Sequence, residues 1–132
     1  MFEKLLNKQI EKQEKVLEKW LTKHDKENPF PNDKVKISEN ISYLDDNKFH
    51  LMDIYQPYNN EKILPIIINI HGGGFLLGKK EVNRLYCAEL AQKWYIVFCV
   101  EYPLSPSAKI IDILNDLIIA INKINEIAID YN

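Results

Sequence analysis

Three consecutive glycines, Gly72 to Gly74, carry the most distinctive chemistry of the sequence. A backbone without Cβ atoms can adopt positive φ angles and lie directly against a ligand. The glycines stand between His71 and Phe75 and follow the mainly apolar run Ile66–Ile70. A β-branched run this short, bounded by turn residues, predicts a strand buried on both faces. The glycines would then present N–H groups at the C-terminal end of a central strand, where open α/β sheets bind their ligands.

Three loop motifs compete for this stretch. A dinucleotide loop, G-x-G-x-x-G/A, fails because Leu77 falls where the third small residue belongs. A P-loop, G-x-x-x-x-G-K-[ST], fits from Gly73 as far as Lys79, but Lys80 replaces the hydroxyl residue that must hold Mg²⁺, so nucleotide binding is only an alternative. The HGGG-type oxyanion loop of lipases and esterases matches His71 to Gly74 without exception and is the favoured interpretation.

Two further segments carry a resemblance to a known family. Residues 102–120 resemble, without a gap, the Y-R-L-A-P-E…A-L-E-D segment of the hormone-sensitive-lipase-like α/β-hydrolases. Residues 51–57 are similar to the L-D-V-Y-x-P strand of bacterial acetyl-esterase-type enzymes. In the first segment the coinciding positions are Tyr102, Leu104, Pro106, Leu114, Asp116 and Ala120. The resemblance covers about residues 35–129 and the first part of the family's domain. It implies an α/β fold whose mixed sheet has the strand order 1-2-4-3, and hydrolysis of small acyl esters through a serine, without metal or cofactor.

The resemblance also implies roles for single residues of the glycine loop. The N–H groups of Gly73 and Gly74 would form the oxyanion hole, and His71, Gly72 and Phe75 would support the loop. Such donors stabilise the tetrahedral oxyanion by about 2.7–4 kcal/mol each. The triad His of this fold comes last in the chain, so we expect His71 to hold the loop and not to act as the base. We also expect Gly73→Ala to impair chemistry more than folding.

The family's catalytic serine lies in a later G-x-S-x-G turn, followed by an acid and then the His. The four glycines here stand at 72, 73, 74 and 78, and none flanks Ser38, Ser42, Ser105 or Ser107. We therefore expect a truncated or split esterase, or half of a two-chain enzyme, which supplies the oxyanion loop and is inactive alone. A small acyl ester would be its substrate only after completion by a C-terminal half. A non-catalytic interaction module is the alternative from another class.

Composition narrows the remaining possibilities. A length of 132 residues with 46% hydrophobic and 27% charged residues predicts one globular domain. The net charge of −2 gives no electrostatic case for nucleic-acid binding. Cys87 and Cys99 lack metal-ligand spacing, which predicts buried thiols. Without a signal-type N-terminus or an apolar run of about 20 residues, we expect a cytoplasmic protein with no membrane span.

The N-terminal region is predicted to be a separate helical segment. Residues 2–24 show amphipathic helical spacing, and the turn-rich residues 28–33 end the helix. We therefore divide the chain into a cap-like segment, 1–34, and an incomplete α/β-hydrolase core, 35–132. In the resembled family such helices cover the acyl pocket, so Trp20 and Leu21 could line it. A plain packing helix is the simpler interpretation.

The core is predicted to contain four strands and two helices. A strand over 35–43 with a bulge near Glu39–Asn40 leads through a turn at 45–48 into a return strand over 49–55. Helices over 82–94 and 109–128 flank an interior strand over 95–101, which makes a parallel βαβ unit with strand 66–70. The second helix is so rich in Ile that we expect most of its circumference to be covered. Glu101, at the end of its strand, is taken as an ordinary polar residue.

The order 1-2-4-3 has a consequence for association. It leaves strand 66–70 at the border of the sheet, with unpaired N–H and C=O groups on one side. Such an edge is a template for pairing with another chain, and exposed apolar surface adds about 25 cal/mol per Å² when it is buried. We therefore predict possible self-association through the strand at 66–70.

Overall fold

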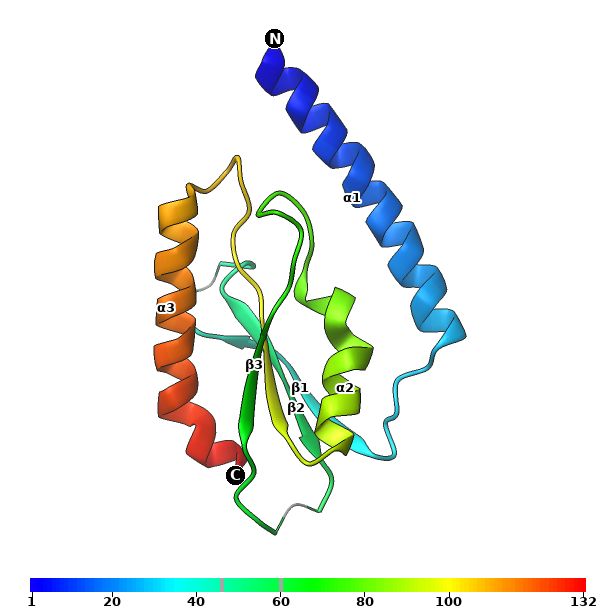
Figure 1. Cartoon of the computed structure of the whole chain (residues 1–132), viewed down its shortest axis with the longest axis vertical. Coiled ribbons are helices and arrows are strands. Elements are labelled where there is room, and N and C mark those ends of the chain that lie inside the picture. Colours follow the sequence, from blue (N-terminus) through cyan, green and yellow to red (C-terminus); the bar gives the residue numbers. More distant parts are fainter. Residues whose placement is uncertain (46, 60) are drawn as a thin grey trace.

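The computed structural model describes residues 1–45, 47–59 and 61–132, which form a four-stranded mixed sheet flanked by helices (Figure 1). The strands are β1 (Val35–Ser42), β2 (Leu51–Pro57), β3 (Ile66–Ile70) and β4 (Ile96–Val100). Their order is β1-β2-β4-β3. The first two pairs are antiparallel, and β3 runs parallel to β4. The predicted α/β class and strand order are confirmed.

Three α-helices accompany the sheet in the part of the chain that the structure describes. They are α1 (Phe2–Glu27), α2 (Arg84–Gln92) and α3 (Ile110–Ile127). In Figure 1, α2 and α3 lie on opposite sides of the sheet, and α1 extends along the end where the loops after β3 and β4 emerge. The helix predicted over 82–94 is shorter, because it is preceded by a 3₁₀ turn (Lys80–Asn83) and stops before Trp94, whose φ is +66°.

Two apolar cores hold these layers together, one on each face of the sheet. Along each strand successive side chains point to opposite faces, so the alternation decides which helix each residue meets. Ile54 and Phe98 pack toward the α3 residues Ile113, Leu117, Ala120 and Ile124. Tyr55, Val97 and Cys99 pack toward the α2 residues Cys87, Ala88 and Ala91. Both cysteines are buried free thiols, as predicted.

The bulge predicted in the first strand is present. The register of β1 against β2 shifts between Ser38 and Ile41, and Asn40 has a φ of +58°. The N–H of Asn40 turns toward the carboxylate of Asp53 and donates to Oδ1 at 2.8 Å. Of the turn predicted at 45–48, Asp46 lies outside the described residues.

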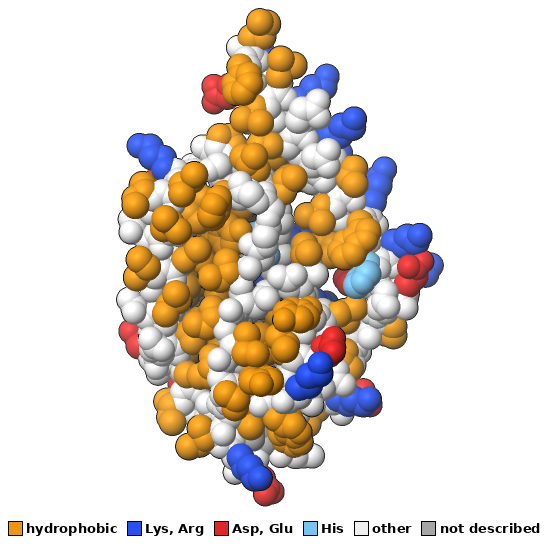
Figure 2. Space-filling model, viewed as in Figure 1, with side chains coloured by type: hydrophobic (Ala, Val, Ile, Leu, Met, Phe, Trp, Pro, Cys, Tyr) orange, Lys and Arg blue, Asp and Glu red, His pale blue; other side chains and the backbone are white. Residues whose placement is uncertain are grey.

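Two predictions about burial, of strand 66–70 on both faces and of helix 109–128 on most of its circumference, were wrong. The side chains of β3 are only partly buried, and Ile66 and Ile70 are 38% and 44% exposed. The reason is that, among the described residues, β3 pairs only with β4. Helix α3 buries a single stripe, and its other face exposes Ile110, Ile111, Leu114, Ile118 and Ile121. An apolar residue pattern alone does not tell which side of a helix has neighbours. We call these five residues the outer face of α3, which contributes to the apolar surface in Figure 2.

Candidate active site

The loops after β3 and β4 meet at one end of the sheet. The strands are parallel and in register, with Ile70 opposite Val100, so the residues that follow them start side by side. The glycine loop, from His71 to the start of the 3₁₀ turn at Lys80, leaves β3, and residues 101–109 leave β4 for α3. Figure 1 shows both loops at the end of the sheet that faces α1. This is the C-terminal edge at which α/β sheets place their sites.

The glycine loop is a tight turn that only glycine can make at Gly73. The carbonyl oxygen of Gly73 accepts from the N–H groups of Leu76 at 3.2 Å and Leu77 at 3.1 Å. The φ angles of Gly73, Gly74 and Phe75 are +131°, +63° and +62°. A Cβ on Gly73 would lie 1.8 Å from the Leu77 oxygen. Gly73→Ala would therefore disturb the fold itself, contrary to the expectation from sequence.

The same turn leaves the predicted donors free. Within residues 1–45, 47–59 and 61–132, no acceptor is placed to receive the N–H of Gly73 or of Gly74. Gly72, Gly73 and Gly74 are all exposed. A Cβ on Gly72 would meet nothing within 4 Å, so the space beside it is open. Two adjacent N–H groups on an exposed loop are thus available to an anionic oxygen.

His71 is held behind the loop by two acceptors and an aromatic ring. Its Nδ1 lies 2.9 Å from the carbonyl oxygen of Gly72, and its Nε2 lies 2.7 Å from Oε1 of Glu101. The ring stacks on Tyr102 with 4.3 Å between centroids, and the Tyr102 hydroxyl donates to the His71 carbonyl at 2.7 Å. The imidazole is buried and turned away from solvent.

Glu101, treated above as an ordinary strand-end residue, is the centre of this arrangement. Its Oε1 also accepts from the N–H of Tyr102, and its Oε2 accepts from the N–H of Lys80, both at 3.1 Å. It therefore binds both ends of the glycine loop, His71 and Lys80. The sequence held a usable signal, since a carboxylate that follows β4 must lie beside the first residue after β3 in a parallel pair.

A second buried group, unnoticed in the sequence, anchors the far end of the loop. The ammonium of Lys80 lies 2.9 Å from Asp53 Oδ2 on β2 and 2.6 Å from Glu81 Oε1. Lys80 is 4% exposed and Asp53 2%. In the sequence, a lysine close to glycines indicates a surface residue. Only the three-dimensional position of Asp53 reveals the buried Lys80–Asp53 pair.

The ionisation of this pair follows from its contacts. Burial lowers the pKa of Lys80, but the carboxylates of Glu81 and Asp53 outweigh it and raise the pKa. Burial also raises the pKa of Asp53, against the opposing contacts with Asn40 and Lys80. The raised pKa of Lys80 favours an ion pair, whereas the raised pKa of Asp53 disfavours one. We assign the ionised pair, because each Asp53 oxygen has a donor at 2.8 or 2.9 Å.

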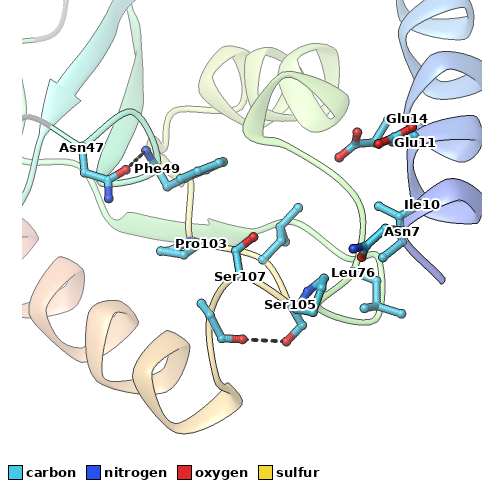
Figure 3. Close-up of a pocket in the computed structure, with 13 residues that line it drawn as sticks. Asn7, Ile10, Glu11, Glu14, Asn47, Phe49, Leu76, Pro103, Ser105 and Ser107 are labelled. Carbon is cyan, nitrogen blue, oxygen red and sulfur yellow. Dashed lines mark hydrogen bonds between the residues drawn. The ribbon is translucent and has the colours of Figure 1, made fainter. Parts of the chain in front are cut away.

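A hollow of about 460 Å³ opens between α1 and the loop after β4. In Figure 3, Asn7, Ile10, Glu11 and Glu14 of α1 lie opposite Pro103, Ser105 and Ser107. The hydroxyl of Ser105 donates to the carbonyl of Ala108 at 2.9 Å. That hydroxyl is therefore engaged within the loop, whose lining of the hollow also includes Pro103 and Pro106.

A smaller hollow, of about 350 Å³, joins α1 to the glycine loop. Trp20 lines it together with Val16 and Leu17 of α1, and with Gly72 and Gly73. The structure thus places Trp20 beside the glycines, and the lining of an acyl pocket by Trp20 stays a prediction. Leu21 is buried, at 5% exposed, and is not among the residues that line this hollow.

The lysines of the P-loop alternative are both engaged. Lys80 is paired with Asp53 and Glu81, and the ammonium of Lys79 is paired with Glu18. This pairing disfavours phosphate binding at the loop. No cluster of three or more His, Cys, Asp or Glu suited to a metal ion occurs in the described part of the chain. The helices that the structure describes include none long and apolar enough to cross a membrane.

Comparison with known proteins places these features in a family. Residues 52–132 match the BD-FAE family. Isoprenylcysteine alpha-carbonyl methylesterase ICME of Arabidopsis thaliana is 31% identical over 81 residues, which are 61% of this chain and 19% of that protein. The probable isoprenylcysteine alpha-carbonyl methylesterase ICME of Oryza sativa subsp. japonica is 31% identical over 65 residues, 49% of this chain and 16% of that protein. The chain thus spans less than a fifth of the length of these relatives.

Solved structures of esterases share the fold. Esterase B of Lactobacillus rhamnosis superposes with a TM-score of 0.89 at 20% identity, over 98% of this chain and 42% of that one. A hyperthermophilic esterase of Pyrobaculum calidifontis gives a TM-score of 0.69 at 24% identity, over 89% of this chain and 36% of that one. The predicted α/β-hydrolase fold and the resemblance to esterases are confirmed.

Proposed function

Because the chain belongs to the BD-FAE family, we propose that it supplies the oxyanion hole of an enzyme that hydrolyses carboxylic esters. The observation that carries the proposal is the pair of free N–H groups on Gly73 and Gly74 at the C-terminal edge of the sheet. The relatives and structural neighbours named above are all esterases. Their names do not agree on one ester substrate. For this chain we therefore propose only the reaction, ester hydrolysis, and a small acyl group in the substrate.

The chemistry proposed for the loop is stabilisation of the tetrahedral intermediate. When a serine attacks the ester carbonyl, negative charge develops on the carbonyl oxygen. The N–H groups of Gly73 and Gly74 would donate to it, with a third donor from the residue after the serine. Each such donor contributes about 2.7–4 kcal/mol in a well-measured case. No G-x-S-x-G occurs in the 132 residues, so the serine, the acid and the base would come from polypeptide outside this sequence.

The segment 1–34 is proposed to act as a cap over the acyl group. Trp20, Val16 and Leu17 present apolar surface to the hollow that Gly72 and Gly73 also line. An acyl chain placed there would have its carbonyl next to the donors. Leu21 would contribute by packing α1 onto the core and not by contact with substrate.

A cytoplasmic location, expected from the sequence, stays a prediction.

The free edge of β3 is the proposed attachment point for the completing polypeptide. One side of β3 is unpaired in the described chain, and the outer face of α3 adds exposed apolar side chains to the same view of the molecule (Figure 2). Without a completing half, we propose that two copies associate through this edge. The same surface supports the alternative function, a non-catalytic interaction module.

A chimera tests the proposed function directly. Residues 1–132 would replace the matching 42% of Lactobacillus rhamnosis esterase B, and hydrolysis of a nitrophenyl butyrate would be measured. We expect turnover well above that of a matched chimera whose nucleophilic serine is changed to Ala. A chimera that melts cooperatively but hydrolyses no faster than this control would refute the proposal.

A further inference from the structure

The two predicted donors belong to peptide groups whose carbonyl oxygens have different hydrogen-bond partners. The N–H of Gly74 shares its peptide group with the carbonyl of Gly73, which accepts from Leu76 and Leu77. The N–H of Gly73 shares its peptide group with the carbonyl of Gly72, whose contact is Nδ1 of His71 at 2.9 Å. A hydrogen bond accepted by a peptide carbonyl polarises the N–H of the same group and strengthens it as a donor.

His71 faces an acceptor at each ring nitrogen. The carbonyl of Gly72 can only accept, so Nδ1 must carry a hydrogen to bind it. The carboxylate of Glu101 lies 2.7 Å from Nε2 and already accepts from two backbone N–H groups, so it is held as an acceptor. Both contacts are satisfied at once only when both ring nitrogens carry hydrogen.

We propose that Glu101 and His71 form a hydrogen-bond relay that ends on the Gly72–Gly73 peptide group and strengthens the N–H of Gly73 as an oxyanion donor. The carboxylate fixes the imidazolium, the imidazolium donates to the Gly72 carbonyl, and the polarised peptide presents its N–H to the substrate. Both residues are positioning residues, because neither touches the substrate. The relay rests on the proposed role of Gly73.

The surroundings suit such a charged pair. The ring of Tyr102 stacks on His71 and its N–H donates to Glu101, while the N–H of Lys80 donates to the other carboxylate oxygen. The ammonium of Lys80 is paired with Asp53 and Glu81, and that of Lys79 with Glu18. Neither ammonium therefore competes with His71 for the carboxylate of Glu101. Gly78 makes room for the ring, since a Cβ there would lie 2.6 Å from Nδ1.

The relay can be tested on the intact chain by nuclear magnetic resonance, without turnover. In ¹⁵N-labelled protein at pH 7, we expect both ring nitrogens of His71 to show the shifts of a protonated imidazolium. In Glu101→Gln, one nitrogen should lose its hydrogen and the Gly73 amide proton should move upfield. The Gly74 amide should keep its shift, because its peptide group is supported by the turn.

A matched control is Asp116→Asn, which removes a carboxylate from His50 and should leave the His71 and Gly73 signals in place. A ring nitrogen of His71 without hydrogen in the unmodified chain would overturn the relay. Equal changes in the amide proton shifts of Gly73 and Gly74 in a folded Glu101→Gln variant would also overturn it. If that variant does not fold, the ring signals of the unmodified chain decide alone. An intact relay in a chimera without esterase activity would count against the oxyanion role, whereas a bare nitrogen in an active chimera would count against the relay only.

Discussion

Breaking the buried Lys80–Asp53 pair should destabilise the protein far more than breaking a surface pair. In Lys80→Met, Asp53 loses the donor at 2.9 Å and keeps only the N–H of Asn40. Removal of one partner from a buried ion pair costs about 3–5 kcal/mol, because the other charge stays buried without compensation. The contact with Glu81 adds little, since that side chain is 39% exposed and screened by water.

The assay is urea unfolding followed by circular dichroism at one fixed protein concentration. We expect Lys80→Met to lower the free energy of unfolding by about 3–5 kcal/mol, and the melting temperature by roughly 6–20 °C. Lys93→Met is the matched control, because its partner Glu89 and Lys93 itself are both 62% exposed. That control should change stability by no more than about 0.5 kcal/mol.

A double-mutant cycle separates the pair from general effects of losing a lysine. Asp53→Asn keeps an acceptor for Asn40 and removes the charge, so adding it to Lys80→Met should recover part of the loss. We expect an interaction free energy of about 2 kcal/mol, within the range for residues in contact. A loss below about 1 kcal/mol for Lys80→Met, or strict additivity in the double variant, would refute the assignment of a buried ion pair.

Three further predictions concern the loop, His50 and the outer face of α3. Gly73→Ala should lower the melting temperature strongly, because the added Cβ would lie 1.8 Å from the Leu77 oxygen. Gly72→Ala should hardly change it, because a Cβ there meets nothing within 4 Å. Equal shifts of the melting temperature in the two variants would contradict the loop geometry. Burial lowers the pKa of His50, but Asp45 and Asp116 outweigh burial, so the pKa in the folded protein is raised. The stabilisation by His50 is therefore complete below its unfolded pKa of about 6.5 and is lost as pH rises through the folded pKa. The stability difference between the protein and His50→Gln should therefore shrink from pH 5.5 to 9, and a constant difference would disprove this linkage. Ile118→Lys, on the outer face of α3 that adds to the surface beside the β3 edge, should shift sedimentation velocity toward monomer relative to the unmodified chain. An unmodified chain that is monomeric at all concentrations would show that no association occurs.

The sequence predicted the individual strands well because their signals are local or nearly so, whereas the strand order came from the resemblance to α/β-hydrolases. The Ile66–Ile70 run, the βαβ spacing and the bulge near Asn40 each follow from residue type and periodicity. Burial was harder to predict, since it depends on what covers β3 and α3 and not on their own composition. The glycine motif located the loop, but it did not reveal its anchors.

The missed anchors were charged residues whose partners are distant in sequence. Lys80 and Asp53 are 27 positions apart, and His71 and Glu101 are 30 apart. Each looks like a surface residue when considered alone, because Lys, Asp and Glu are seldom fully buried without a partner. A search for carboxylates at the C-terminal ends of neighbouring parallel strands would have found Glu101.

Glu101 binds both His71 and Lys80, and this has a consequence for the entropy of ligand binding. With its two ends bound to one carboxylate, the glycine loop is a closed ring whose conformational freedom is lost when the chain folds. A ligand that arrives later meets donors already in position and loses little of its binding free energy to ordering the loop. Changes at the tip of the loop, at Leu76 for example, should therefore alter the shape of the hollow that Leu76 lines more than they alter the direction of the two N–H groups.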